Sequence, residues 1–421
     1  MTLYYNTWGL PYSATSQRAV NDFESAITAY LASATDTMAQ LDEILTYDAT
    51  MPMVHCFRGY LLKLAAHPQF TGALQTCADQ ANGLLAQGVC NAREQAHVQA
   101  LALWCADHTD QALSVLENSL REYPLDMLAL RIAHYMHFYD GRGEAMRDST
   151  ARVLTSWPQD HEHYGYLHGM HAFGLEESGQ YDEATEFGKR AVTQNPGDIW
   201  ATHAVAHVYL MRNEHTEGLA WIRSLTSNFA HTNNFRYHVY WHEALHLLGL
   251  GESSLAIKFY DEHLAASVVD DFYLDLCNNA ALLWRLEFLG VDVGDRWQAL
   301  AACAEKHVHD RELVFASLHY LIPLVATGSI GKDELIETVR SWSQQATCQG
   351  RVCAEVGNVL AQAIVESATA PAAGASLLAA NLSQTYQIGG SHAQRDLFRL
   401  LGVHSAQRVA RDDLVAALNA H

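Results

Sequence analysis

The sequence lacks most of the features that mark a membrane, secreted or zinc-finger protein. It has no run of about 18 apolar residues, so no segment is predicted to cross a membrane. Its first residues, MTLYYNTWGLPYS, show no basic start followed by an apolar stretch, which argues against a secretory signal. The eight cysteines include no CxxC pair, so we expect free thiols in a reducing cytoplasm rather than a disulfide scaffold.

Positive charge is also scarce. The chain has 26 lysines and arginines against 47 acidic residues, a formal net charge of −21. Such a chain would repel a phosphate backbone, so nucleic acid is not an expected partner. Apolar residues are plentiful, at 49% of the chain, which is enough to bury a large core. Histidine is abundant as well, with 24 residues.

A repeat of about 34 residues runs through the middle of the chain. Pro124 and Pro158 are 34 positions apart, and Pro196 follows 38 positions later. Segment 166–196, YLHGMHAFGLEESGQYDEATEFGKRAVTQNP, is predicted to form a helix, a turn at Gly179, a second helix from Tyr181 and a proline stop. Its small, turn, aromatic and proline residues match the tetratricopeptide pattern at Ala172, Gly179, Tyr181, Ala184, Ala191 and Pro196.

The predicted fold is therefore all-α, with tetratricopeptide-like helical hairpins that form a right-handed superhelix, an α-solenoid. We expect residues 1–92 to form N-terminal helices and a first helical hairpin, and residues 93–270 to form five repeats. Residues 271–421 are expected to add helical hairpins that close the superhelix. No sustained alternation of polar and apolar residues occurs, so strands are not expected.

The repeat register predicts where side chains point. In this repeat type, positions 2, 5, 9 and 12 of the first helix face the concave wall, whereas positions 4, 7, 8 and 11 pack between helices. In repeats that start at residues 93, 127, 199 and 237, the wall positions hold His97, Arg131, His203, His207, His238 and Trp241. His168 and His171 fall at packing positions. The alternative interpretation is a polar lining whose histidines bond only to neighbours or water.

His203 and His207 are the strongest candidates. Residues four apart on a helix lie about 5–6 Å apart at Cβ, so the two rings can share one ligand, proton or ion. The main hypothesis is that the protein binds no metal ion and no cofactor. A weaker alternative is a divalent ion held by His203, His207, His238 and His242.

The segment WHEALH, residues 241–246, contains the HExxH motif of zinc proteases, and Glu262 imitates a third ligand. The setting disfavours that chemistry. The motif lies in the first helix of a repeat, and the next segment is the expected turn and second helix. No strand is expected beside it to hold a substrate.

The segment YQIGGSHAQRDLF, residues 386–398, is the other unusual stretch. Gly389 and Gly390 loosen the backbone, and Ser391 with Gln394 forms a predicted capping box that opens a helix. His392, Arg395 and Asp396 follow in the first turns of that helix. Free amides at a helix start, together with an arginine, attract carboxylate or phosphate groups. An ordinary capped helix is the alternative.

IGGSHAQRDLF, WATHAVAHVYLMRNEHTEGLAWI, YWHEALHLLGLGESSLAIKFYDEHL and AALLWRLEFLG together resemble the tetratricopeptide repeat protein 38 family over nearly the whole chain. The resemblance implies one α-helical superhelix and supplies no general reaction. Members carry an acidic residue and a serine just before LLWRL, where this chain has Asn278 and Ala281, so no role is carried over to those two positions. The family motif near residue 240 centres on the spacing of His238 and His242, which further weakens the protease interpretation.

Two functions remain open at this point, and with them the question of whether the protein is an enzyme. The first is a small polar or anionic metabolite bound in a histidine-rich groove, with histidine as acid or base for hydrolysis or elimination. The second is a scaffold that grips a short peptide in the groove. Oligomers remain possible. The expected proton-transfer residues are His203, His207, His238 and His392. The expected ligand-binding residues are His97, Arg131, Trp200, Trp241, His319, Arg395 and Asp396.

Overall fold

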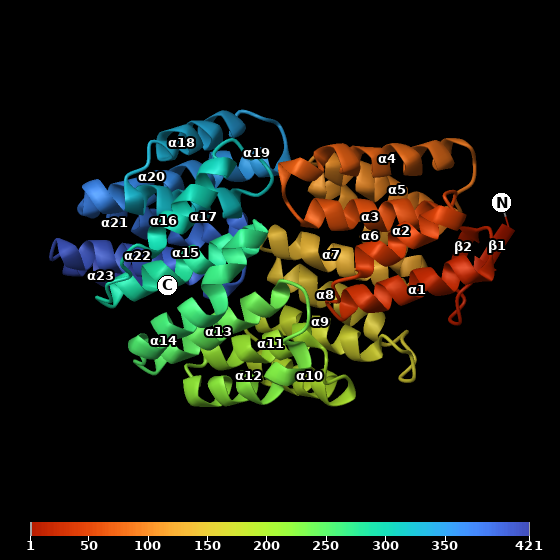
Figure 1. Ribbon diagram of the computed structural model, residues 1–421, viewed down its shortest axis with the longest axis horizontal. Helices are drawn as coiled ribbons and strands as arrows, with labels where there is room; N and C mark the ends of the chain where they lie inside the picture. Colours follow the sequence, from red (N-terminus) through yellow and green to blue (C-terminus); the bar gives the residue numbers. More distant parts are fainter. Residues whose placement is uncertain (1, 421) are drawn as a thin grey trace. The chain divides into compact units, whose positions relative to one another are not determined.

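Helical hairpins make up most of the chain in the computed structural model, which describes residues 2–420 (Figure 1). The all-α prediction is confirmed. Among the described residues, no helix combines the length and the apolar character needed to cross a bilayer.

The N-terminal region contains the helical hairpin predicted before the repeats. Its helices are α1 (Gln17–Leu31), α2 (Thr37–Tyr47), α3 (Pro52–Leu64), the short 3₁₀ helix η1 (Pro68–Phe70) and α4 (Thr71–Ala86). Helix α3 packs against α4, and α1 packs against α2.

The helices of segment 92–259 lie where the five repeats are predicted, and the number of repeats stays a prediction. They are α5 (Ala92–Cys105), α6 (Thr109–Glu122), α7 (Met127–Tyr139), α8 (Gly143–Leu154), α9 (Tyr164–Glu176), α10 (Tyr181–Gln194), α11 (Ile199–Met211), α12 (His215–Phe229), α13 (Phe235–Gly249) and α14 (Ser253–Phe259). The turn at Gly179 has φ +75°, and α10 begins at Tyr181 as predicted. At Gly188 a Cβ atom would lie 2.5 Å from Val205, so a small residue is needed where α10 meets α11.

The C-terminal region stays helical after the period is lost. Its elements are the π-helical turn η2 (Tyr260–Leu264), η3 (Ala265–Asp270), α15 (Tyr273–Phe288), α16 (Arg296–Ala304), η4 (Glu305–His307), α17 (Val314–Thr327), α18 (Gly331–Trp342), α19 (Cys348–Val352), the π-helical turn η5 (Cys353–Gly357), α20 (Asn358–Thr369), α21 (Pro371–Asn381), η6 (Leu382–Ile388), α22 (His392–Arg408) and α23 (Asp412–Asn419).

The expectation that strands are absent is wrong at the N-terminus. Strand β1 (Thr2–Tyr5) pairs antiparallel with β2 (Pro11–Ala14), with Thr2 opposite Ala14. The connecting turn is held by Asn6, whose Oδ1 accepts the backbone N–H groups of Trp8 at 3.0 Å and Leu10 at 2.9 Å. Strands of four residues are too short to show a sustained alternation, which is why the sequence pattern missed them.

The chain divides into two compact units by its internal contacts. The first unit comprises Met1–His137, Gly143–Val208 and Ser224–Arg236, and the second comprises Phe138–Arg142, Tyr209–Arg223 and Tyr237–His421. Segment 93–270 contributes to both units, and the predicted division at residues 92 and 270 stays a prediction.

Candidate functional sites

In the first unit, α7 and α11 place Arg131 against an aromatic surface. The guanidinium carbon of Arg131 lies 4.0 Å from the ring centre of Trp200 and 4.6 Å from that of Tyr135. One Nη atom donates a hydrogen bond to the Tyr135 hydroxyl at 3.1 Å. Arg131 is buried and forms no ion pair with any described residue. Cation–π contacts with the aromatic rings are therefore the main stabilisation of its charge.

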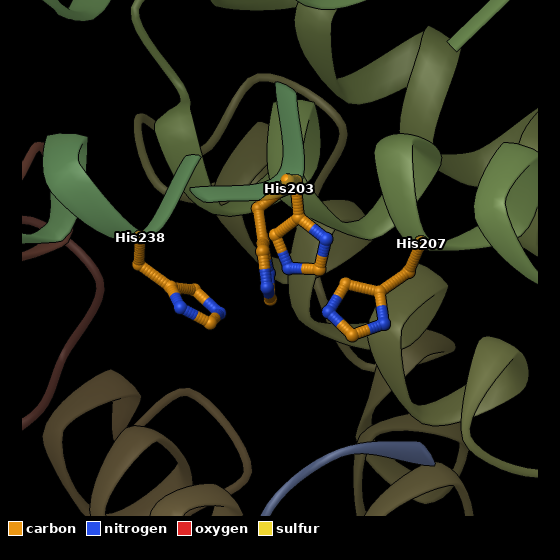
Figure 2. A group of neighbouring side chains, drawn as sticks. His203, His207 and His238 are labelled. Atoms are coloured by element: carbon orange, nitrogen blue, oxygen red, sulfur yellow. The ribbon is translucent and has the colours of Figure 1, made fainter. Parts of the chain in front are cut away.

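His203 and His207 lie next to each other on α11 (Figure 2). Their ring centres are 4.4 Å apart with planes at 78°, and Phe173 contacts both rings. The Trp200 ring centre lies 5.6 Å from that of His203. The two histidines are only 2% and 0% exposed, so they are buried rather than spread along an open groove. Four of the predicted site residues, counting Arg131, therefore belong to one buried cluster in this unit.

Glu176 is a cluster member that sequence analysis missed. It is the last residue of α9, and its Oε2 lies 3.6 Å from Nδ1 of His207. Both side chains are 0% exposed. Glu176, Glu177 and His207 offer ligand atoms that all lie within 4.8 Å of one another. The repeat register could have predicted this residue. With His168 at position 4 of its repeat, Glu176 takes position 12, and position 12 also faces the concave wall in this repeat type.

Asp198 and His134 are the other buried titratable groups near Arg131. Burial raises the pKa of Asp198 to about 7, although a backbone N–H bond from Ala201 and the charge of Arg131 act in the opposite direction. Burial, helped by the charge of Arg131, holds the pKa of His134 well below its usual value, so this ring is neutral. The first unit thus buries a fixed cation beside a carboxyl group that titrates near neutral pH.

His97 belongs to a different network of the first unit. One ring nitrogen lies 2.9 Å from Asp126, which also pairs with Arg93 at 2.9 Å, and the Tyr60 hydroxyl lies 3.2 Å from the other. Burial alone would raise the pKa of Asp126, but the charge of Arg93 and hydrogen bonds from His97 and Arg93 outweigh it and lower the pKa. The network ties α5 to β2, because Arg93 also donates to the Pro11 carbonyl at 2.9 Å. The predicted ligand-binding role of His97 stays a prediction.

The second unit contains a cavity of about 710 Å³, which we call the arginine pocket. It is lined by residues of α13, α15, η6 and α22, and by Leu210, Met211, Asn213 and His215. The predicted residues His392, Arg395 and Asp396 all line it. Arg285, Arg399 and His215 complete its charged and titratable wall, and leucine, methionine and phenylalanine side chains supply most of the rest.

The start of α22 forms the capping box that the sequence predicts. The backbone N–H of Gln394 donates to Ser391 Oγ at 3.3 Å, and the backbone N–H of Ser391 donates to Gln394 Oε1 at 2.9 Å. Gly389 and Gly390 both have φ +76°, which favours glycine. At Gly389 a Cβ atom would lie 2.3 Å from the Tyr139 carbonyl oxygen. This backbone therefore fixes where α22 begins at the pocket wall.

Arg285, like Arg399 and His215, is a pocket residue that was not predicted from the sequence. It lies on α15, is 6% exposed, and donates to the carbonyl oxygens of Ala393 at 2.7 Å and Ala281 at 3.2 Å. No ion pair links it to a described carboxylate. Burial lowers the pKa of Arg285 to about 10, against the opposing charge of Asp396. Its signal was a single arginine inside the otherwise apolar run LLWRL.

The remaining pocket groups differ in how they are held. Arg399 pairs with Asp396 through Nε at 2.6 Å, so these two charges balance. Arg395 is buried and donates to the Gly390 carbonyl. His392 is exposed at the first turn of α22. Burial lowers the pKa of His215, whose Nδ1 lies 3.3 Å from Nδ1 of His246. The pocket therefore carries more positive than negative fixed charge.

The other predicted residues of the second unit do not line the arginine pocket. His238, which Figure 2 also labels, has Nδ1 3.2 Å from Asn278 Oδ1 and stacks on Trp241. The Trp241 ring lies 5.5 Å from the guanidinium carbon of Arg285. His319 donates from Nδ1 to the Phe315 carbonyl at 2.8 Å, and burial lowers its pKa to about 4.

The HExxH segment shows no protease-like arrangement. Glu243 pairs with Arg223 at 2.7 Å, and exposed Glu262 pairs with Lys258. Within residues 2–420, no group of potential metal ligands unites His242 and His246 with Glu262. The sequence also offers a four-histidine metal site. His203 and His207 belong to the first unit, and His238 and His242 belong to the second. This site stays a prediction.

No family model matches the chain. The chain is similar to a solved structure described as "Structure of Naa15/Naa10 bound to HypK-THB", at 12% sequence identity and a TM-score of 0.27. The match covers 96% of this chain and 62% of that chain, so the present chain spans less than two thirds of it. Similarity at this level carries no argument about function.

Proposed function

We propose that the protein binds a small anionic molecule in the arginine pocket of its second unit. The observation that carries this proposal is Arg285. A guanidinium that is 6% exposed and has no ion pair with a described residue is costly to bury, even with two carbonyl partners. A bound carboxylate or phosphate supplies the missing negative charge.

The pocket also indicates the kind of anion. Arg285 and Arg395 present planar guanidinium groups, which bind carboxylate and phosphate through paired hydrogen bonds. The apolar part of the wall includes Leu245, Leu248 and Phe288. A cavity of about 710 Å³ is within the size range of small-molecule sites. The preferred ligand therefore has one acidic head and a hydrocarbon or aromatic body.

His392 extends the proposal from binding to chemistry. Imidazole is the side chain that most often serves as a general acid or base, and His392 lies on the same wall as Arg395. An anion held by the arginines would place a neighbouring atom within reach of this ring. Proton transfer to or from the bound molecule is the reaction class that we propose.

Isothermal titration with octanoate, phenyl phosphate and neutral octanamide tests the binding proposal. We expect the two anions to bind and the neutral amide to bind at least about tenfold more weakly, because it lacks the charge that Arg285 pairs with. Arg285→Met should weaken anion binding by about tenfold or more. The matched control is Arg411→Gln, because Arg411 pairs with Asp413 outside the pocket. Equal binding by wild type and Arg285→Met would contradict the proposal.

A protein-interaction scaffold is the second candidate function. The observation in its favour is the helical-hairpin fold, because arrays of such hairpins bind extended or helical peptides on their surfaces. The resemblance to the tetratricopeptide repeat protein 38 family, which we propose as the chain's relationship, is compatible with either function. Stoichiometric recovery of one protein partner by both wild type and Arg285→Met, with no anion binding by either, would favour the scaffold.

A further inference from the structure

We propose that a second cavity of the second unit binds a small zwitterion of the α-amino acid class. This cavity of about 240 Å³, which we call the Glu287 cavity, is lined by residues of α15, α17, α20 and α22. Its charged and titratable lining residues are Glu287, His404 and Arg408. Of the described lining residues, only Phe288 also lines the arginine pocket, and the site does not depend on the proposed function.

The cavity contains two opposite charges that are not paired inside the protein. Glu287 Oε1 accepts a hydrogen bond from the indole N–H of Trp297 at 2.9 Å, and Arg408 donates from Nη1 to the Ser367 carbonyl at 2.9 Å. Neither Glu287 nor Arg408 forms an ion pair with a described residue. Burial raises the pKa of Glu287 against the hydrogen bond from Trp297, so a cation beside this carboxylate would be stabilising. A ligand with one cationic and one anionic end would satisfy both groups.

The hydroxyl of Ser405 points most directly to a ligand. Ser405 lines the cavity and is 0% exposed, and its Oγ has no hydrogen-bond partner among the described residues. The large majority of buried polar side-chain atoms in folded proteins have a partner, because an unpaired one has lost its bond to water without replacement. A polar atom of a bound molecule would supply that partner.

An aromatic row contributes to the cavity lining. The ring centres of Trp284 and Phe288 are 5.4 Å apart, and the His404 ring stacks on Phe288 at 4.8 Å with planes at 27°. Glu287 lies between Trp284 and Phe288 in the sequence of α15. Aromatic faces attract ammonium groups, so this part of the cavity suits a cation. Burial, helped by the charge of Arg408, lowers the pKa of His404, so its ring is neutral and does not repel that cation.

The size of the cavity limits the ligand. At roughly 30 Å³ per water molecule, a volume of about 240 Å³ holds about eight waters. A molecule that replaces them has about eight non-hydrogen atoms, as valine and leucine do. The lining also includes Val325, Ala326 and Leu401, whose apolar side chains suit an aliphatic group. We expect the ammonium group near Glu287 and the carboxylate near the exposed residue Arg408.

Isothermal titration of the full chain with L-leucine, L-leucinamide and 4-methylpentanoate tests the proposal. The three ligands are compared on Arg285→Met protein, because the arginine pocket is itself proposed to take carboxylates. We expect one leucine to bind. Leucinamide lacks the carboxylate and 4-methylpentanoate lacks the ammonium group, so each should bind at least about tenfold more weakly.

Leucine binding by variants of the cavity assigns the site. Glu287→Gln and Arg408→Gln should each weaken leucine binding by about tenfold or more relative to wild type. The matched control is Arg340→Gln, because Arg340 pairs with Glu337 on α18 and does not line the cavity. No leucine binding to wild type, or binding that is lost in Arg285→Met and kept in Glu287→Gln, would overturn the proposal.

A second measurement applies if a charge variant fails to fold. Leucine should raise the unfolding temperature of wild type, because a ligand that binds only the folded state stabilises it. Without leucine, Ser405→Ala should unfold at the same temperature as wild type, since the hydroxyl has no partner among the described residues to lose. With leucine, its unfolding temperature should rise less than that of wild type. An equal rise in the two proteins would contradict the proposed site.

Discussion

Arg93 in the first unit and Arg285 in the second show how differently the two regions treat a buried cation. Arg93 pairs with Asp126, and the charge of Asp126 outweighs burial and raises the pKa of the arginine. Among residues 2–420, Arg285 has only carbonyl hydrogen-bond partners and an aromatic neighbour, and burial lowers its pKa to about 10. The first arginine is neutralised inside the fold. The second has no counter-ion among the described residues, and its charge is the one that the proposed anion would pair with.

The largest expected effect comes from breaking the neutralised pair. Asp126→Asn should destabilise the protein by about 3–5 kcal/mol, because it leaves the Arg93 charge buried without its counter-ion and weakens the bond to His97. Urea unfolding of the variant and wild type measures the difference. A decrease in the free energy of unfolding below about 1 kcal/mol would mean that the buried charge of Arg93 does not need the Asp126 carboxylate for stability. The contrast between Arg93 and Arg285 would then disappear.

The next effect concerns the pH dependence of the first unit. The pKa of Asp198 is raised by burial to about 7 in the folded protein, whereas an unfolded aspartate titrates near 3.9. The folded state therefore binds this proton more tightly. The resulting stability is fully present below about pH 4 and is lost as the pH rises toward 7.

Asp198→Asn should remove this dependence, because asparagine keeps an oxygen for the Ala201 amide and carries no charge. Between pH 5 and 7 wild type should lose about 1.4 kcal/mol per pH unit relative to the variant. Unfolding free energies at pH 5, 6 and 7 provide the measurement. Parallel curves for the two proteins would contradict the expectation.

A smaller stability effect is expected at the second arginine. Arg285→Met replaces a buried charge by an apolar chain of similar length, a change that is often close to neutral. We expect the free energy of unfolding to change by less than about 1.5 kcal/mol while anion binding is lost. Destabilisation as large as that of Asp126→Asn would assign Arg285 a structural role like that of Arg93.

The hairpins could be predicted because their signals are local. The small residues of segment 166–196, the turn at Gly179 and the box formed by Ser391 and Gln394 each act within a few positions along the chain. The strands β1 and β2 gave no such signal at four residues each.

The sites could be predicted only in part. The register places His203, His207 and Arg131 together, and the structure gathers them in one cluster. Whether such a wall is open or buried depends on what packs over it, and both histidines are buried. Arg285 was missed because an arginine in an apolar helix can also extend to the surface, and only its neighbours distinguish the two cases.

The smallest expected effect comes from the N-cap of α22. A substitution at this cap tests whether anion binding depends on the position of α22 at the pocket wall or on the charge of the arginines. Ser391→Ala removes the bond to the Gln394 amide and should cost about 1 kcal/mol of stability. The helix keeps its start, because Gly389 and Gly390 hold the backbone before it with φ +76°. Anion binding measured by titration should therefore fall less than about threefold, since the cap carries no charge. A loss equal to that of Arg285→Met would mean that the position of α22, rather than the guanidinium, controls binding.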